Sequence, residues 1–159
     1  MPFISVMKKS VLPILAGQSA AHTYEFKTYA KHKEEEEEYW ELLLEGGKGL
    51  DKSYSFYFHY DNNEVGSFGL SPMPNCCGVV VVGGVYLRPE FRGTTVSRKF
   101  REMRNELIKS LGYSMAIATT VTSDPAADKN FTKVGYTRSD EFVNKRTGNP
   151  LVLGWKVLK

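Results

Sequence analysis

Cysteine is scarce in this sequence, and long apolar runs are missing from it. The two cysteines, Cys76 and Cys77, are adjacent, and disulfide geometry resists a bridge between neighbouring residues. No second pair exists to complete a zinc site, so we expect free thiols, no metal and a reducing, cytoplasmic setting. No apolar run is longer than Val79 to Val82, whereas a membrane-spanning helix needs about 20 residues. The sequence therefore predicts no membrane span.

The composition excludes two further classes of protein. With 42% hydrophobic and 13% aromatic residues, the chain does not have the low hydrophobicity that keeps a chain disordered. Its 159 residues fit one domain, since domains typically have about 100–150 residues, and a tandem of two enzymatic domains does not fit. We expect a single domain over residues 1–159, with specificity coming from this domain or from a second copy of it.

The small net charge of +3 hides an asymmetry between the two halves of the chain. Residues 1–88 carry 8 basic and 11 acidic groups, whereas residues 89–159 carry 13 basic and 7 acidic groups. A basic half indicates an anionic ligand, either a phosphorylated cofactor or nucleic acid. A charge of +6 spread over 71 residues favours the cofactor. The acidic run Glu34–Glu38 is interpreted as the solvated face of a helix.

The residue pattern predicts a mixed α/β domain. Helices are expected over residues 31–44, 94–111 and 125–134, and Gly112 is placed to cap the second of them. Apolar, β-branched or aromatic runs predict the strands. These runs are Phe3–Met7, Tyr54–Tyr60, Glu64–Leu70, Gly78–Leu87, Tyr113–Val121 and Leu151–Leu158, with further strand material at Val143.

The junction between the strand ending at Leu87 and the helix starting at Thr94 is the segment that carries chemistry. The start of a helix presents unpaired backbone N–H groups and the positive end of its dipole, which together hold phosphate. Arg92, Arg98 and Lys99 add positive charge nearby. The alternative interpretation is an ordinary turn with exposed basic residues.

This junction resembles the pyrophosphate loop of the GNAT superfamily of N-acetyltransferases. The run Leu87-Arg88-Pro89-Glu90-Phe91-Arg92-Gly93 is similar to that family's strand end and arginine-glycine loop, and Phe131 to Tyr136 is similar to its later helix with a Gly-aromatic ending. The resemblance covers residues 53–158. It implies a mostly antiparallel sheet flanked by helices, in which a central pair of strands splays apart and acetyl-CoA wedges between them.

Carried over residue by residue, the resemblance implies a donor site without a metal. Backbone groups of Val85 and Leu87 would face the pantetheine and the acetyl carbonyl, N–H groups from Arg92 to Ser97 would surround the pyrophosphate, and Arg98 or Lys99 would approach the adenosine phosphates. The complete set of implied cofactor-binding residues is Val85, Leu87, Arg92, Gly93, Thr94, Thr95, Val96, Ser97, Arg98 and Lys99.

The sequence departs from the family pattern at two places. Thr95 stands where the family has a glycine, which lets backbone approach phosphate closely, and Ser97 replaces a small residue. Phe131 stands where many members have the tyrosine that protonates the departing thiolate, and a phenyl ring has no proton to give. The loop is therefore degenerate. Either another group or water acts as the acid, or turnover is slow, or the chain is a non-catalytic relative.

A base for the amine acceptor is not identified by the sequence. His59, Glu64 and Asp124 are candidates, because a carboxylate or an imidazole can take the proton of an amine directly or through water. Each has a structural alternative: His59 as a histidine on an edge strand, and Glu64 as an exposed residue after a turn.

Two functions from different classes remain open, and a third is disfavoured. The first is an N-acetyltransferase that uses acetyl-CoA and an amine on a small molecule or a protein. The second is a catalytically impaired relative that serves as a binding or structural protein. Nucleic-acid binding would use Arg101 and Arg104 beside the loop, but a solvated helix face explains these two residues.

Overall fold

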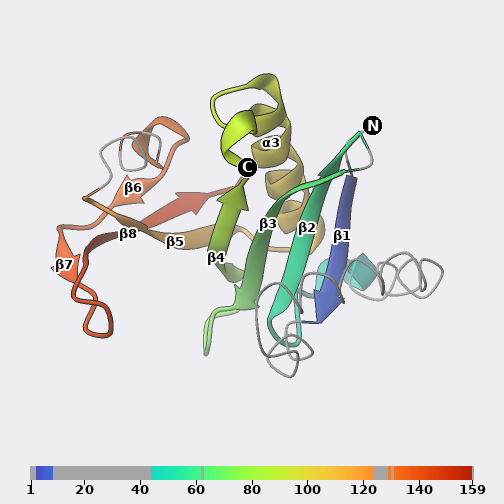
Figure 1. Cartoon of the computed structure of the whole chain (residues 1–159). Coiled ribbons are helices and arrows are strands. Elements are labelled where there is room, and N and C mark those ends of the chain that lie inside the picture. The colour runs from blue at the N-terminus through green and yellow to red at the C-terminus, as the bar shows by residue number, and fades with distance from the viewer. Residues whose placement is uncertain (1–2, 9–43, 62, 124–128, 130, 159) are drawn as a thin grey trace.

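The computed structural model describes residues 3–8, 44–61, 63–123, 129 and 131–158 (Figure 1). In chain order its elements are β1 (Phe3–Lys8), the 3-10 turn η2 (Glu45–Gly47), β2 (Tyr54–Tyr60), β3 (Asn63–Pro72), β4 (Val79–Leu87), η3 (Pro89–Phe91), α3 (Thr95–Ser110), β5 (Met115–Val121), β6 (Thr137–Arg138), β7 (Phe142–Val143) and β8 (Pro150–Val157). No helix within these ranges is long and apolar enough to cross a membrane.

The described strands form one mixed sheet of eight strands. Their order is β1-β2-β3-β4-β5-β8-β6, and β7 pairs separately with β8. Only β4 and β5 run parallel among these pairs, and α3 provides the connection between them. The expectation of a mixed, mostly antiparallel sheet is confirmed. β7 contains Val143, where strand material was expected, whereas β6 was not expected, because two residues are too few to show a periodicity.

Most predicted elements lie where the sequence pattern placed them, but two predicted helices are described only in part. The predicted helix over residues 31–44 lies outside the described residues except for its last residue. Of the predicted helix over residues 125–134, the structure describes 129 and 131–134, and residues 129 and 131–133 are helical. Cys76 and Cys77 are exposed free thiols, as the sequence predicted.

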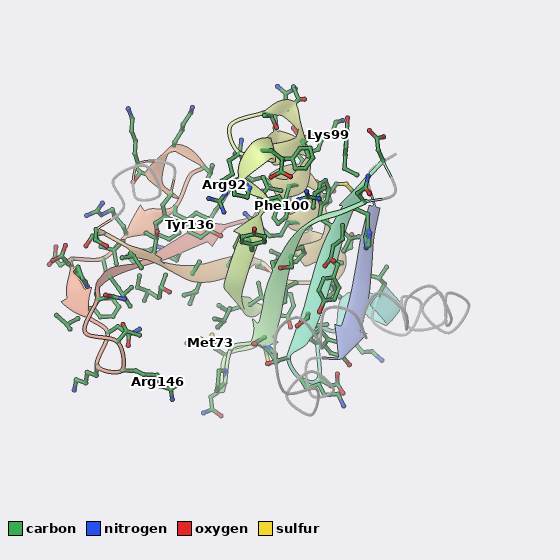
Figure 2. The ribbon with its side chains drawn as sticks, in the orientation of Figure 1. Met73, Arg92, Lys99, Phe100, Tyr136 and Arg146 are labelled. Atoms are coloured by element: carbon green, nitrogen blue, oxygen red, sulfur yellow. The ribbon has the colours of Figure 1, made fainter. Side chains whose placement is uncertain are left out.

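The core forms between the aromatic side chains of β2 and β3 and the apolar face of α3. Phe56 stacks on Phe68 with ring centroids 5.3 Å apart, and Phe58 meets Phe100 of α3 edge-on at 5.1 Å. The neighbouring residues Phe100 and Lys99 point to different sides of the helix, Phe100 toward the sheet and Lys99 away from it (Figure 2). This packing fixes how α3 sits on the sheet.

Two glycines allow close approaches that fix the position of α3. A Cβ on Gly66 of β3 would lie 2.2 Å from Phe100 Cε2, so the missing side chain makes room for the ring. Gly112 follows the helix with φ of +94°, and a Cβ there would lie 1.8 Å from the carbonyl oxygen of Gly47. The predicted left-handed cap is confirmed, and it also lets the segment before β2 pack against the end of α3.

The central feature of the sheet is that β4 and β5 separate along their length. Their pairing runs only from Val79 opposite Met115 to Val81 opposite Ile117, although β4 continues to Leu87 and β5 to Val121. Figure 1 shows the two strands diverging beyond these pairs. The splayed central pair that the resemblance implied is therefore present. Within the described part of the chain, no strand pairs from Val82 onward with the edge of β4 that faces β5.

Candidate functional site

The outer half of β4 carries a bulge that turns its backbone at the splay. Ser67 of β3 pairs with Tyr86, but Gly69 pairs with Gly83, so β4 advances three residues while β3 advances two. Gly84 lies inside this bulge with φ of +58°, a conformation that glycine adopts without strain. The bulge exposes residues 83–86.

The alternation of hydrogen bonds indicates which backbone groups of β4 face the splay. The Arg88 N–H donates to the Val65 carbonyl of β3 at 2.8 Å. Successive residues of a strand direct their N–H and C=O groups to opposite edges. The backbone groups of Leu87 therefore point toward the edge that faces β5, and Leu87 is one of the two residues for which the sequence predicted donor contacts. The other, Val85, lies within the bulge, where this alternation is interrupted.

The loop between β4 and α3 turns sharply, so that α3 starts close to the end of β4. Gly93 has φ of +72°, and a Cβ there would meet nothing within 4 Å. Thr94, the residue before the helix, donates from Oγ1 to the Phe91 carbonyl at 2.5 Å. α3 starts at Thr95, and its first N–H groups have no acceptor within the helix. Thr95 is exposed, and the Val96 side chain is buried.

Arg92 folds back over the end of β4 instead of extending into solvent. Its Nε donates to the Leu87 carbonyl at 2.8 Å, and its guanidinium lies 5.6 Å from the centre of the Tyr86 ring. The side chain therefore occupies an acceptor on the open edge of β4. A ligand that pairs with the Leu87 carbonyl shares this acceptor with the arginine or displaces it.

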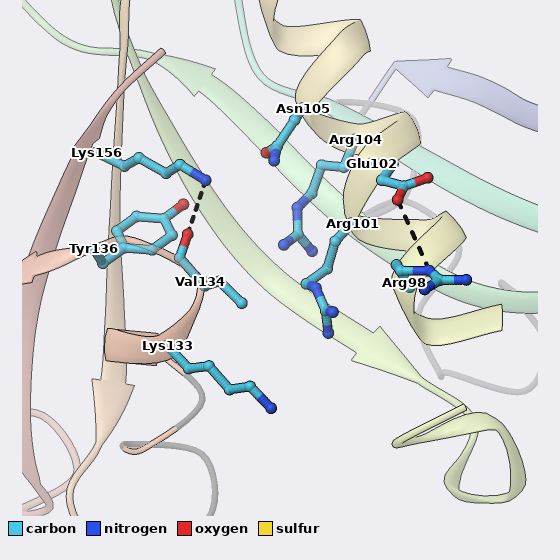
Figure 3. Close-up of a pocket in the computed structure, with 9 residues that line it drawn as sticks. All are labelled: Arg98, Arg101, Glu102, Arg104, Asn105, Lys133, Val134, Tyr136 and Lys156. Atoms are coloured by element: carbon cyan, nitrogen blue, oxygen red, sulfur yellow. Dashed lines mark hydrogen bonds and ion pairs between the residues drawn. The ribbon is translucent and has the colours of Figure 1, made fainter. Parts of the chain in front are cut away.

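A cavity of about 310 Å³ lies between α3 and the segment that runs from residue 133 to β8 (Figure 3). Its walls carry five cationic side chains and one carboxylate. The lining residues are Arg98, Arg101, Glu102, Arg104, Asn105, Lys133, Val134, Tyr136 and Lys156. Of the residues that the sequence predicted to bind the donor, Arg98 lines this cavity, whereas Lys99 is exposed outside it. A cavity with this balance of charge favours an anion.

Two arginines of α3 correct the prediction of a solvated helix face. Arg101 and Arg104 are partly buried and line the cavity. The Arg104 guanidinium lies over two core rings, 5.3 Å from the centre of Phe100 and 6.0 Å from that of Phe68. The helical pattern had placed both arginines on the polar side. That pattern did not show that the polar side of α3 lines a cavity instead of facing water.

The opposite wall of the cavity is built by the end of the helical segment at residues 131–133. Gly135 closes that segment, as the sequence predicted, and the Tyr136 N–H donates to the Phe131 carbonyl at 3.3 Å. Lys156 of β8 donates from Nζ to the Val134 carbonyl at 2.8 Å, which ties this wall to the sheet. Burial raises the pKa of the Tyr136 hydroxyl, and the positive charge of Arg104 opposes that rise.

Phe131 is held in the second wall by two close contacts. Its ring stacks on Tyr136 with centroids 4.5 Å apart. It also occupies the space above Gly154 of β8, where a Cβ would lie 2.2 Å from its Cε1 and Cζ atoms. The position at which the family resemblance places a proton-donating tyrosine is thus filled by a packed phenyl ring.

The two candidate bases that the structure describes, His59 and Glu64, do not line the cavity. His59 is only 4% exposed and lies on β2, between β1 and β3, so the interpretation as an edge-strand histidine is wrong. Burial lowers its pKa to about 4, and the imidazole is neutral near pH 7. Glu64 lies on β3 opposite His59 and is partly buried rather than exposed. Asp124 lies outside the described residues.

Sequence reasoning missed most of the cavity, because its walls come from distant segments. Arg101, Arg104 and Asn105 repeat at the three- and four-residue spacing of one helix face, which is a usable signal. Lys133 and Lys156 give no such signal, since they approach α3 only through the fold.

Comparisons with known proteins find similarity in structure and not in sequence. No family model matches the chain, and no curated protein sequence does so significantly. The ribosomal-protein-S18-alanine N-acetyltransferase of Escherichia coli superposes with a TM-score of 0.60 at 10% identity, over 100% of this chain and 95% of that one. A Bacillus anthracis protein described as a streptothricin acetyltransferase, in complex with acetyl coenzyme A, gives 0.58 at 11% identity, over 69% and 65%.

A third structure sets the extent of the likeness. A Chromobacterium violaceum protein described as a GNAT-family acetyltransferase gives a TM-score of 0.56 at 14% identity, and the match covers 68% of this chain. The chain spans only 60% of the length of that protein. At these identities the likeness concerns the backbone arrangement alone. The chain has the fold of the GNAT acetyltransferases.

Proposed function

We propose that the chain is an N-acetyltransferase that transfers the acetyl group of acetyl-CoA to an amine, by direct attack in a ternary complex. The observation that carries the proposal is the unpaired edge of β4, which opens beside a cationic cavity and below the start of α3. An extended neutral arm can pair with a strand edge, and a pyrophosphate suits the start of a helix. The bound acetyl coenzyme A of the B. anthracis neighbour agrees with this use of the fold.

Donor binding is assigned to backbone groups more than to side chains. The N–H groups of Gly93 and of residues 95–97 would hold the pyrophosphate, because those of Arg92 and Thr94 already donate to the Pro89 and Phe91 carbonyls. Arg98 and Lys99 are assigned to the adenosine phosphates. The backbone groups of Val85 and Leu87 would pair with the pantetheine arm, and Arg92 would share or release the Leu87 carbonyl. Thr95 retains its backbone N–H. The replacement of the family's glycine by threonine therefore reduces the space for the phosphate but does not remove a hydrogen-bond donor.

The chemistry requires few side chains. The amine nitrogen attacks the thioester carbonyl carbon, a C–N bond forms and the C–S bond breaks. The amine loses one proton and the thiolate gains one, so the reaction is balanced in protons. Holding the two substrates together supplies a large part of the rate, and N–H groups that polarise the carbonyl supply more. His59 is a weak base near pH 7 because of its low pKa, so positioning accounts for catalysis better than this imidazole does.

Phe131 favours one alternative, a GNAT-like protein that binds a ligand or a partner with impaired turnover. The phenyl ring is packed between Tyr136 and Gly154, and it cannot donate a proton to a departing thiolate. Water would then be the acid in an active enzyme. An impaired relative would retain the cavity and lose the chemistry.

Calorimetric titration of the protein with acetyl-CoA, followed by a test of thiol release with a panel of amines, separates these functions. We expect a dissociation constant in the micromolar range and an amine-dependent release of CoA. Binding without release for any amine would support the impaired relative. No binding of acetyl-CoA or of free CoA would overturn the acetyltransferase and leave only a relative that serves a protein partner. Exposed Cys76 and Cys77 also react with thiol reagents, so a protein blank is subtracted.

A further inference from the structure

The cationic side chains of the cavity extend much deeper than the proposed pyrophosphate site. Arg98 lies in the first turn of α3, but Arg104 lies nine residues beyond Thr95, which is about 13 Å of helix rise. The pantetheine arm, which would follow β4 inward from the loop, carries no charge. The deep cations are therefore not explained by the arm that would pass beside them.

Arg104 has the properties of an arginine that is set up to bind an anion. Its guanidinium is supported by the rings of Phe100 and Phe68, and stacking on a ring leaves the N–H groups at its edges free to donate. Among the described residues, neither Arg101 nor Arg104 forms an ion pair, whereas Arg98 pairs with Glu102 at 3.9 Å. Burial lowers the pKa of Arg104, so a bound anion would relieve an unfavourable buried charge.

The surroundings of Arg104 suit a small anion at the inner end of the cavity. Tyr136 approaches from the opposite wall (Figure 3), and its hydroxyl can donate a further hydrogen bond. Lys156 is held on that wall by its bond to the Val134 carbonyl. A planar carboxylate matches the two parallel N–H donors of a guanidinium.

We propose that the inner cavity, with Arg104 at its centre, binds a carboxylate at the far end of the acyl group, so that the preferred donor is the CoA thioester of a short dicarboxylic acid. This inference rests on the proposed function, because it needs a CoA thioester in the splay. It changes the donor from acetyl-CoA to an acyl-CoA with a negative tail.

The reaction stays balanced with such a donor. The amine attacks the thioester carbonyl carbon, the C–N bond forms and the C–S bond breaks. The amine loses one proton, and the CoA thiolate gains one. The distal carboxylate is unchanged, so the product is an N-acyl compound that carries a free acid.

Succinyl-CoA and butyryl-CoA provide the test, because they have the same number of acyl carbons and the same CoA portion. They differ in whether the chain ends in a carboxylate or in a methyl group. We expect the protein to bind succinyl-CoA at least about tenfold more tightly in calorimetry, as a charged hydrogen bond allows. Arg104→Gln should reduce this preference to less than about twofold, and Arg104→Lys should restore part of it.

Arg146→Gln is the matched control, because it removes the same charge from an exposed loop between β7 and β8, far from α3 (Figure 2). It should keep the preference of the unmodified protein. If Arg104→Gln does not fold, Arg101→Gln tests the same preference. Equal binding of the two thioesters by the unmodified protein would overturn the inference. An Arg104→Gln variant that loses the same affinity for succinyl-CoA and for butyryl-CoA would also overturn it. If no CoA compound binds, the proposed function itself fails.

Discussion

A carboxylate placed at the first residue of α3 should have opposite effects on stability and on donor binding. Thr95 is exposed, and the first turn of α3 contains no acidic residue. In Thr95→Asp the new charge lies at the positive end of the helix dipole, which stabilises a helix by about 0.3–1 kcal/mol. For a chain of this length that corresponds to a rise in Tm of about 1–3 °C.

The same carboxylate should repel a pyrophosphate bound at this helix start. With each of the two negative charges of the pyrophosphate at about 5 Å from the carboxylate, and an effective dielectric constant between roughly 40 and 80, the two repulsions add up to about 2–3 kcal/mol. The Kd for CoA should therefore rise by roughly 30- to 150-fold. Added salt should reduce this effect, since the site is open to solvent.

Calorimetry and thermal unfolding of the same samples make the test. Thr147→Asp is the control, because it adds the same charge to an exposed turn and retains an acceptor for the Asn149 N–H, which Thr147 Oγ1 binds at 3.2 Å. Its affinity for CoA should equal that of the unmodified protein. If Thr95→Asp gained stability and still bound CoA normally, the pyrophosphate would not lie at the start of α3.

Three further changes test other parts of the structure. His59 has a pKa of about 4 in the folded protein and about 6.5 when unfolded, so the unfolded chain binds more protons between these values. Stability should fall by up to about 3 kcal/mol as pH drops from about 6.5 to 4, and urea unfolding of His59→Gln should lack that part of the slope. Gly66→Ala forces a Cβ to within 2.2 Å of Phe100. Chemical denaturation should show a loss of about 1–3 kcal/mol in the free energy of unfolding. Gly83→Ala, where a Cβ meets nothing within 4 Å, should lower the free energy of unfolding by less. Phe131→Tyr supplies an acid, and kcat with acetyl-CoA should rise at least about tenfold with little change in KM; an unchanged kcat would exclude thiolate protonation as the missing step.

The sequence predicted the parts of the fold that depend on local patterns. The apolar spacing from Val96 to Leu107 defined the buried face of α3, and both residues are buried in the structure. Gly112 marked the end of the helix through its left-handed conformation. The aromatic run of β2 and its return in β3 formed a hairpin, because their spacing matched a turn and two pleated faces.

The sequence did not predict features that exist only after distant segments meet. Arg104 occupies the polar side of α3, and a helical pattern does not show that this side lies over the rings of Phe68 and Phe100. The residue pattern indicates a strand over residues 3–7 but does not show that it pairs with β2, and this pairing places His59 inside the sheet rather than at its edge. The family resemblance, rather than periodicity, implied the splay of β4, because nothing in the residues of β4 shows where its neighbour departs.

The short pairing between β4 and β5 has a consequence for how the protein moves. Only three residue pairs join the half-sheet β1–β4 to the half-sheet β5–β8. The main core cluster draws on β2, β3, β4 and α3, with Ala116 its single member from β5 and none from β8. We expect amides of β8 to exchange hydrogen faster than those of β3, because less of the core covers them. A donor lying along the gap would contact both half-sheets. We expect it to restrict their relative motion for as long as it is bound.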